Sequence, residues 1–493
     1  MLENIKIHEN DNVAIAMTPL SKGMQIDMAK ESVTLIEDIP QGHKFALRDI
    51  KIGEMIQKYG FPIGKASVDI PQGSWIHVHN LTTNLGEVLE YTYEPKVTYN
   101  EPQEHASFMG YAREDGKTGI RNEVWIIPTV GCVNSIAQQI IKQSEVYTEG
   151  KVEGIQAFPH PYGCSQMGDD HVNTQKALAA LVNHPNAGAV LVLGLGCENN
   201  HIEEFKKVLG EYNPKRVKFL ECQSAEDEIE DGVEIMKELI EYAGGFKRTA
   251  VDASELIIGL KCGGSDGLSG ITANPLVGRF SDILISKGGS TILTEVPEMF
   301  GAETILMNRC INEDIFNATV GLINGFKNYY KKHDQVIYEN PSPGNKKGGI
   351  STLEDKSLGC TQKGGTAPVV DVLAYAERLT VKGLNLLESP GNDLVAATAL
   401  ALSGAHIVLF TTGRGTPFGA PVPTIKVSTN NALYNKKTNW IDFNAGKLVE
   451  GVSMDTLGNE FFDYVLSVAS GAQTKSEKAG CRDLAIFKQG VTL

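Results

Sequence analysis

Cysteines near the ends of predicted strands are the first residues whose positions suggest chemistry. Cys132, Cys164, Cys197 and Cys262 each lie in or close to a turn that follows an apolar run. In parallel α/β proteins, ligands bind beyond the carboxyl ends of the strands, so these thiols would lie where a ligand binds. A single free cysteine is more often a small core residue. The pattern therefore leaves open both a shared functional site and four separate packing positions.

Histidines in the first eighty residues offer a second kind of ligand. In the run from Trp75 to Asn80, the alternation puts Trp75, His77 and His79 on one face of a predicted strand. Two imidazoles at this spacing can bind one divalent metal ion, although such a pair is more often a packing or surface feature. His43 follows a similar glycine turn, and we expect it nearby if the two turns are adjacent.

A glycine-dense turn, Cys262-Gly-Gly-Ser-Asp-Gly-Leu-Ser-Gly270, lies between a predicted strand and a helix. Its backbone N–H groups suit a carboxylate or phosphate, and a tight turn with close helix packing explains the glycines equally well. No Gly-Lys-Ser/Thr closes this turn, and the pair Gly194 and Gly196 lacks the third glycine of a dinucleotide fingerprint. Nucleotide binding is therefore weakly supported.

Glycine turns and strand–helix alternation predict the elements that hold these residues. Three Asp-Ile-x-x-Gly repeats, at 38–42, 49–53 and 69–73, each precede a strand-like run (43–47, 54–59 and 74–80). We predict a small all-β module over residues 1–90 and a linker over 91–106. Beyond these, strands alternate with helices, which predicts α/β domains with largely parallel sheets over 107–245 and 246–493. The hydrophilic stretch 340–349 is expected to be a mobile surface loop.

The overall composition limits the partners. The 493 residues include 45 Lys and Arg against 60 Asp and Glu, a formal net charge of −15. This balance makes nucleic acids and anionic membranes unlikely partners, and the most apolar stretch falls short of the roughly 20 residues that cross a bilayer. Without a signal-peptide pattern and with dispersed cysteines, we expect a cytoplasmic enzyme that acts on a small molecule and can form a homo-oligomer.

Ordered motifs from about residue 5 to residue 420 resemble the altronate/galactarate dehydratase family, whose chains begin with a SAF-type β-clip module. Chance does not account for motifs of this length and order. The motifs are 6–14, 42–47, 58–64, 77–80, 110–116, 119–123, 128–134, 261–267, 270–275, 295–298, 359–365 and 411–417.

The resemblance implies a hydro-lyase of sugar-acid catabolism. The N-terminal motifs and the length point to dehydration of D-altronate to 2-dehydro-3-deoxy-D-gluconate, in hexuronate (galacturonate) breakdown. Galactarate is the alternative substrate, and a non-catalytic sugar-acid-binding protein is the alternative from another class. The family implies Fe²⁺ as the cofactor, with Mn²⁺ as a substitute. An iron–sulfur dehydratase is conceivable from the cysteines, although their spacing does not match common ferredoxin patterns.

The expected site lies between the β module and the α/β domains, and the resemblance and the chemistry of dehydration suggest roles for its residues. Metal binding or proton transfer is assigned to His77 and His79, with His43 nearby. Histidine ligands are preferred because substitution by Mn²⁺ favours a site with hard ligands. Thiolates are the alternative metal ligands, namely Cys164, Cys197 and Cys262. Three cationic side chains are expected to bind the substrate carboxylate, namely Lys261, Arg121 and Arg414. Lys261 is also expected to be catalytic. Polar side chains are expected to hold hydroxyls, namely Asn134, Asn274, Ser265 and Asp266.

Overall fold

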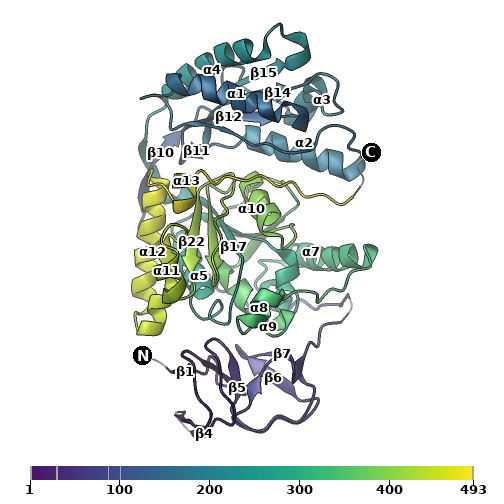
Figure 1. The fold of residues 1–493 in the computed structure, drawn as a ribbon, viewed down its shortest axis with the longest axis vertical. Coiled ribbons are helices and arrows are strands. Elements are labelled where there is room, and N and C mark those ends of the chain that lie inside the picture. Colours follow the sequence, from purple (N-terminus) through teal and green to yellow (C-terminus); the bar gives the residue numbers. More distant parts are fainter. Residues whose placement is uncertain (1–2, 29–31, 87, 100, 491–493) are drawn as a thin grey trace.

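Three tiers of structure follow one another along the long axis of the molecule (Figure 1). The computed structural model describes residues 3–28, 32–86, 88–99 and 101–490. A small β module forms one end, an α/β domain built on a seven-stranded sheet lies in the middle, and an α/β domain built on a four-stranded sheet forms the other end. This arrangement confirms the predicted fold class. Among the described residues, no helix is both long and apolar enough to span a membrane.

The N-terminal β module consists of short antiparallel strands joined by tight turns. Gly42, Gly53 and Gly73, which end the three repeats, all have φ near +80° (81°, 81° and 80°), a conformation that glycine adopts without steric cost. The three sheets have the orders β1-β2-β5-β8, β3-β4 and β6-β7-β9. The strands are β1 (Asn4–Ile5), β2 (Val13–Ala16), β3 (Gln25–Asp27), β4 (Ser32–Thr34), β5 (Lys44–Ala46), β6 (Met55–Lys58), β7 (Phe61–Ala66), β8 (Trp75–Ile76) and β9 (Leu81–Thr82).

The strand predicted over 74–80 is much shorter in the structure. It ends at Ile76, because the Oδ1 atom of Asn80 accepts a hydrogen bond from the His77 backbone N–H at 3.0 Å and turns the chain. His77 and His79 therefore lie in a turn and not on one face of a regular strand.

The segment from 84 to 105, here called the strap, connects the β module to the far tier. Its described residues form no helix or strand. The strap nevertheless binds to the middle domain: the Tyr91 hydroxyl donates to Glu303 at 2.6 Å, and the Tyr93 hydroxyl donates to the Cys310 carbonyl at 2.6 Å. The predicted linker is thus fixed along the surface of the domain that it passes.

The first α/β domain is built on a parallel sheet of order β13-β12-β14-β15. Helices α1 and α4 pack on one face, and α2 and α3 bury apolar side chains in the core on the other face. A small antiparallel sheet, β11-β10-β16, lies beside it. The elements are β10 (Ser107–Ala112), β11 (Thr118–Gly119), β12 (Glu123–Pro128), α1 (Asn134–Ser144), β13 (Ile155–Ala157), α2 (Gly168–Val182), β14 (Ala187–Gly194), α3 (Ile202–Leu209), β15 (Val217–Glu221), α4 (Glu228–Gly244) and β16 (Thr249–Asp252).

The second α/β domain carries seven parallel strands in the order β19-β20-β18-β17-β21-β22-β23. The turn after its central strand β17 approaches the β module, since the Gly267 backbone lies against that of Gly42. The strands are β17 (Ile257–Cys262), β18 (Ser290–Leu293), β19 (Val369–Leu373), β20 (Leu384–Leu387), β21 (Ile407–Thr412), β22 (Thr424–Ser428) and β23 (Phe443–Asn444). The helices are α5 (Ala273–Ser286), α6 (Glu303–Met307), α7 (Glu313–Lys332), α8 (Pro343–Lys347), α9 (Leu353–Cys360), α10 (Asp393–Leu402), α11 (Asn431–Lys436), α12 (Met454–Ala469) and α13 (Lys475–Lys478).

The surface loop expected over 340–349 is in fact a docked helical turn. Helix α8 begins with a capping box between Ser342 and Asn345, and Pro343 occupies its first turn. The Asn345 amide donates to the Ser265 carbonyl at 2.9 Å. The segment therefore packs against the glycine-dense turn.

The C-terminal segment joins the two α/β domains. Arg482 forms two hydrogen bonds to the Glu123 carboxylate, at 2.6 and 2.7 Å. The backbone N–H groups of Gln489 and Gly490 donate to Asp170 at 2.6 and 2.8 Å. In Figure 1 this yellow segment runs along the boundary between the two tiers.

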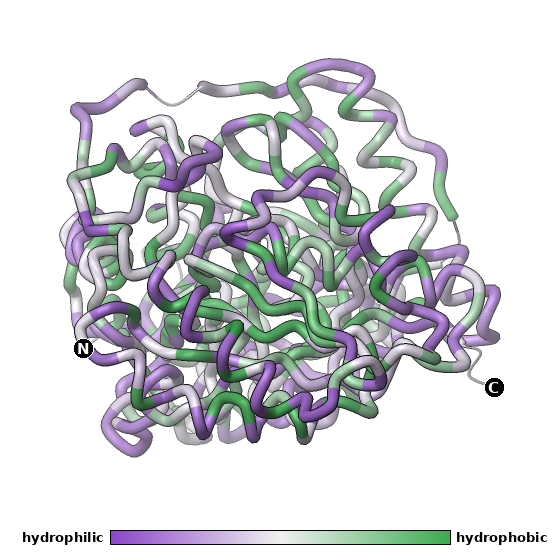
Figure 2. The backbone as a smooth tube through the Cα atoms, turned by 90° about the horizontal axis from the view of Figure 1, so that it is seen from above, coloured by the Kyte–Doolittle hydropathy of each residue, from purple (hydrophilic) through white to green (hydrophobic). Residues whose placement is uncertain are grey.

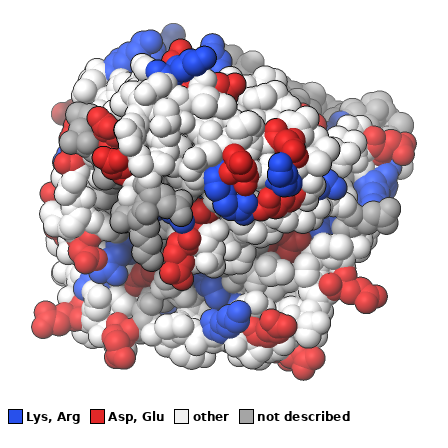
Figure 3. Space-filling model, turned by 90° about the horizontal axis from the view of Figure 1, so that it is seen from below, with Lys and Arg blue, Asp and Glu red and all other residues white. Residues whose placement is uncertain are grey.

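Hydropathy and charge follow the layers. In the view from above, many central segments of the backbone are green, whereas many outer segments are purple (Figure 2). This is the pattern expected of a sheet buried on both faces. On the face seen from below, lysine and arginine side chains are interspersed with acidic ones (Figure 3).

Candidate metal centre

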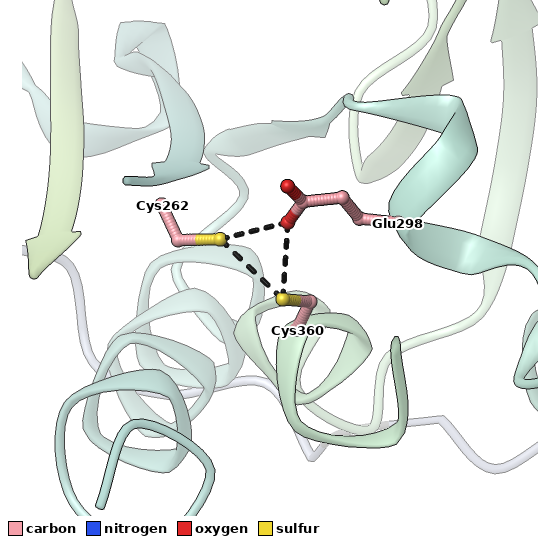
Figure 4. A group of neighbouring side chains, drawn as sticks. All are labelled: Cys262, Glu298 and Cys360. Carbon is pink, nitrogen blue, oxygen red and sulfur yellow. Dashed lines mark hydrogen bonds between the residues drawn. The ribbon is translucent and has the colours of Figure 1, made fainter. Parts of the chain in front are cut away.

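Two thiols and one carboxylate meet in the interior of the second α/β domain (Figure 4). Cys262 ends strand β17, Glu298 lies in a short helical turn after β18, and Cys360 ends helix α9. The Glu298 Oε2 atom lies 3.0 Å from the Cys262 Sγ and 3.2 Å from the Cys360 Sγ, and the two sulfur atoms are 3.4 Å apart. All three residues are buried. We call this group the triad.

The turn after β18 positions the carboxylate of the triad. Glu295 adopts a left-handed conformation (φ 67°), which is uncommon for a residue other than glycine and is often found at functional sites. Its side chain accepts a hydrogen bond from the Cys262 backbone N–H at 2.9 Å. Glu295 therefore links the end of β17 to the turn that carries Glu298.

Three buried lysines surround the triad. The Lys356 Nζ is 2.7 Å from Glu298, the Lys261 Nζ is 2.6 Å from Glu295, and the Lys363 Nζ is 3.8 Å from Glu295. Burial alone would lower the pKa of Lys356, but the Glu298 carboxylate together with the Cys262 and Cys360 thiols outweighs it and raises that pKa. Burial would raise the pKa of Glu298, yet Lys356 and the other lysines bring it down to about 2. These groups are therefore charged at neutral pH.

The donor set of the triad suits a soft or borderline metal ion. Thiolates favour iron and zinc, whereas Mn²⁺ prefers oxygen ligands. Hydrogen bonding to Cys262, together with burial, raises the pKa of Cys360 well above its usual value, so metal binding would release thiol protons. Two thiolates and a divalent cation add no net charge to the cluster. The triad can thus hold Fe²⁺ or Zn²⁺, and it fits Mn²⁺ less well.

A small polar cavity lies next to the triad. Three of the predicted hydroxyl-binding residues, Ser265, Asp266 and Asn274, line it together with Lys356 and Cys360. The Ser265 hydroxyl oxygen is buried without a hydrogen-bond partner among the described residues, so it is available to a ligand. Burial raises the pKa of Asp266. The structure therefore brings together three of the four residues that sequence analysis assigned to hydroxyl binding.

The β module closes one side of this cavity through a buried ion-pair group. The Lys44 Nζ and Lys58 Nζ atoms lie 2.8 and 2.9 Å from the two carboxylate oxygens of Asp355. We call these three residues the lysine clamp. Burial lowers the pKa of Lys44 to about 8, because Asp355 offsets the burial only in part and Lys58 adds repulsion. Lys58 and Asp355 also line the cavity.

Three of the predicted histidines gather beside Trp75 at the same boundary. The His43 and His77 ring centroids are 5.1 Å apart, and His79 lies 5.3 Å from the Trp75 ring. The His77 Nδ1 atom is 3.1 Å from the Ser351 hydroxyl, adjacent to Ile350 in the cavity wall. Burial, Lys44 and His43 lower the pKa of His77 to about 4, so its imidazole is neutral at neutral pH. His79 is exposed.

The other predicted residues lie in different surroundings. Lys261 is next to the triad, but its Nζ is saturated by Glu295, Asp393 and the Cys262 carbonyl. The remaining residues make contacts outside the triad and its cavity. Arg414 lies beside Gly264 and donates to the Gly344 carbonyl. Arg121 pairs with Glu477, and Asn134 donates to the His160 carbonyl. Cys164 and Cys197 lie in loops of the first α/β domain.

Several residues of the site escaped sequence analysis as candidates. Glu298 and Cys360 lie inside motifs that carry the family resemblance, at 295–298 and 359–365. The motifs were the available signal, but nothing local linked these two residues to Cys262. Lys44 and Lys58 also lie inside such motifs, at 42–47 and 58–64, whereas Asp355 lies outside them.

Comparison with known proteins identifies relatives along the whole chain. Family models described as the altronate/galactarate dehydratase SAF domain, the D-galactarate dehydratase/altronate hydrolase second domain, and the D-galactarate/altronate dehydratase C-terminal domain match residues 2–84, 110–244 and 253–492. The chain is 57% identical to an altronate dehydratase of Bacillus subtilis, over 99% of each chain, and 54% identical to one of Escherichia coli, over 100% of each. A galactarate dehydratase (L-threo-forming) of Escherichia coli is 34% identical, over 98% of this chain and 96% of that one.

Proposed function

The chain belongs to the D-galactarate/altronate dehydratase family, and from this premise we propose that it dehydrates D-altronate to 2-dehydro-3-deoxy-D-gluconate in hexuronate breakdown. Identity of 57% and 54% with altronate dehydratases over the full length supports this substrate, against 34% with the galactarate enzyme. The observation that carries the chemistry is the buried triad, which borders a polar cavity lined with lysines.

The reaction removes a weakly acidic proton from C2, next to the substrate carboxylate, and a hydroxyl group from C3. A divalent metal ion held by Cys262, Glu298 and Cys360 would supply Lewis acidity to stabilise the negative charge that develops. The two buried cations that line the cavity, Lys58 and Lys356, favour a bound carboxylate. Ser265, Asp266 and Asn274 then orient the hydroxyl groups, which aligns one diastereomer for reaction.

We assign proton abstraction to His77. Its imidazole is neutral at neutral pH and can accept a proton. It lies where the β module meets the cavity wall, hydrogen bonded to Ser351. Lys261 has three acceptors for its Nζ, and its pKa is raised by Glu295 and Asp393 although burial opposes this. Lys261 therefore stays charged and positions Glu295 and the end of β17.

An anaerobic turnover assay tests the proposal. Purified protein is loaded with Fe²⁺ and given D-altronate or galactarate, and formation of the 2-keto-3-deoxy acid is measured with and without a chelator. We expect chelator-sensitive product from D-altronate. Product from galactarate alone would replace the substrate assignment. Ligand-induced thermal stabilisation without product from either acid would indicate a binding protein instead.

The choice of metal and the residue roles are tested separately. Metal content after anaerobic loading with Fe²⁺, Zn²⁺ or Mn²⁺ should favour Fe²⁺ or Zn²⁺ over Mn²⁺, because two of the three ligands are thiolates. His77→Gln should abolish turnover while metal content and melting temperature stay unchanged. Loss of bound metal in His77→Gln would instead make the histidine a ligand.

We also propose a cytoplasmic location and a homo-oligomeric state for this enzyme. All eight cysteines are free thiols, as expected of a protein kept in a reducing compartment. Cell fractionation and light scattering of the purified protein test these two proposals.

A further inference from the structure

Three exposed cysteines, remote in sequence from the triad, follow adjacent strands of the first α/β domain. Cys132 comes after β12, Cys164 after β13 and Cys197 after β14. These strands are neighbours in the order β13-β12-β14 and run parallel, so their carboxyl ends share one edge of the sheet. We call the three loops at this edge the thiol edge. Their cysteines have no part in the dehydration proposed above.

Backbone hydrogen bonds tie the three loops together beside the cysteines. The Gly131 N–H, next to Cys132, donates to the Tyr162 carbonyl at 2.9 Å. On the other side, the Asn200 N–H donates to the Gly163 carbonyl at 3.1 Å, and the Ser165 N–H donates to the Asn199 side chain at 2.8 Å. Gly163 and Ser165, on either side of Cys164, are therefore hydrogen bonded to the loop that carries Cys197.

The close approach of these loops depends on glycine. A Cβ atom on Gly163 (φ +99°) would lie 2.1 Å from the Thr129 carbonyl oxygen, and one on Gly131 would lie 2.7 Å from the His160 carbonyl oxygen. Ser165, beside Cys164, has a positive φ of 51°. Backbone strain of this kind is concentrated at functional sites.

Unpartnered polar groups lie in the same loops. Gln166 and Asn200 are 3% and 0% exposed, and among the described residues their side-chain oxygens have no hydrogen-bond partner. The helices that follow the three loops, α1, α2 and α3 (labelled in Figure 1), begin without a side-chain cap on their N-terminal N–H groups. The dipoles of three helices with their N-termini at this edge favour negative charge there.

We propose that Cys132, Cys164 and Cys197 bind an iron–sulfur cluster at the thiol edge. A single tetrahedral ion with metal–sulfur bonds of about 2.3 Å would need the sulfurs about 3.8 Å apart. The three sulfur atoms do not all lie within 4.8 Å of one another, whereas the described ligand atoms of the triad do. A cluster spans a wider set of thiolates because each binds a different iron. Its negative charge would lie near the N-termini of α1, α2 and α3.

A fourth cysteine supplies the matched control. Cys222 follows the next strand, β15, but packs against the apolar core of the domain. Cys222 is only partly exposed, whereas the three cysteines of the thiol edge are exposed, so Cys222 is not expected to reach the cluster. Its replacement should leave cluster binding unchanged.

The experiment is anaerobic reconstitution of the full-length protein with ferrous iron and sulfide. Iron, acid-labile sulfide and visible charge-transfer absorption are measured after gel filtration. Wild type, Cys222→Ser and the double variant Cys262→Ser/Cys360→Ser should all incorporate sulfide-containing iron. The triple variant Cys132→Ser/Cys164→Ser/Cys197→Ser should fall to background, with an unchanged melting temperature.

Alkylation of the wild type gives a reading that does not depend on the variants. After reconstitution, peptide mass spectrometry should find these three cysteines protected from iodoacetamide, and removal of iron should expose them. The proposal is overturned if the triple variant keeps the iron and sulfide of the wild type. It is equally overturned if the triad double variant loses them, or if the edge binds one Zn²⁺ and takes up no sulfide.

Discussion

Replacement of Asp355 by asparagine is expected to release the β module from the second α/β domain. Asp355 is the only carboxylate within ion-pair distance of Lys44 and Lys58 among the described residues, and the side chains of Asp355 and Lys44 are fully buried, with that of Lys58 2% exposed. Removal of one partner from a buried ion pair costs about 3–5 kcal/mol, because a charge is left without compensation. Since about 1.4 kcal/mol is a factor of ten, docking of the module should weaken by roughly 10²-fold to 4 × 10³-fold.

Hydrogen exchange at the module boundary measures this effect. Peptides that cover 42–46 and 263–270 lie on opposite sides of the contact between Gly42 and Gly267. Their amide exchange should accelerate in Asp355→Asn relative to wild type. Asp69→Asn is the control, because Asp69 pairs with Lys51 at 3.1 Å while the two side chains are 58% and 74% exposed, and such pairs contribute about 0–1 kcal/mol.

Equal exchange rates in Asp355→Asn and Asp69→Asn would refute this reasoning. The pH dependence gives a second check. Burial would raise the pKa of Asp355, but Lys44 and Lys58 outweigh it and hold the pKa below its usual value. The stabilisation is therefore fully present above the ordinary aspartate pKa of about 3.9 and is lost only as the pH falls toward the lowered pKa.

Three further changes test other parts of the structure. Cys360→Ser should abolish metal binding by the triad and turnover, as measured by metal analysis and the assay for keto acid. His406 donates to the Thr118 carbonyl and accepts from the Ile257 N–H, and burial lowers its pKa to about 4. The free energy of unfolding should therefore fall by up to about 3 kcal/mol from pH 6.5 to pH 4. The variant His406→Gln should reduce this dependence on pH. Tyr91→Phe removes the hydrogen bond to Glu303 and should weaken strap binding by about 1 kcal/mol, which is seen as faster hydrogen exchange in residues 88–99.

Each of these changes has a matched control. Cys310→Ser removes a buried thiol outside the triad and should keep the metal. His105→Gln alters a histidine whose side chain is 89% exposed and should leave the acid slope as in wild type. Tyr99→Phe changes a tyrosine that is 71% exposed and should not affect the strap. A control that behaves like its partner would contradict the corresponding explanation.

The fold was accessible from the sequence because its signals are local. The glycines of the Asp-Ile-x-x-Gly repeats needed positive φ and lie in turns just before strands β5, β6 and β8, where strands were expected. Apolar runs separated by helical patterns indicated parallel strands, and both parallel sheets are present. Segment 340–349 was wrongly predicted as a loop because its many glycines and lysines are typical of loops. The segment also contains Ser342, Pro343 and Asn345, a short pattern that begins a helical turn.

The site depends on pairings that no local pattern encodes. Cys262 could be selected because it follows a strand, but Glu298 and Cys360 are 36 and 98 positions further along the chain. They meet it because β18 pairs with β17 and α9 packs beside the turn that carries Glu298. Lys44 and Asp355 are 311 positions apart. Such contacts follow from the order of strands and domains, which a single sequence does not state.

The C-terminal segment has a consequence for synthesis of the chain. Glu123 and Asp170 leave the ribosome early, whereas their partners Arg482, Gln489 and Gly490 are synthesised 319 to 359 residues later. Domains near the N-terminus fold first during translation, so the first α/β domain forms with these carboxylates still lacking those partners. These contacts between the two α/β domains form in full only after translation has passed residue 490. A prematurely terminated product would therefore present an unfinished boundary, open to proteases that remove incomplete chains.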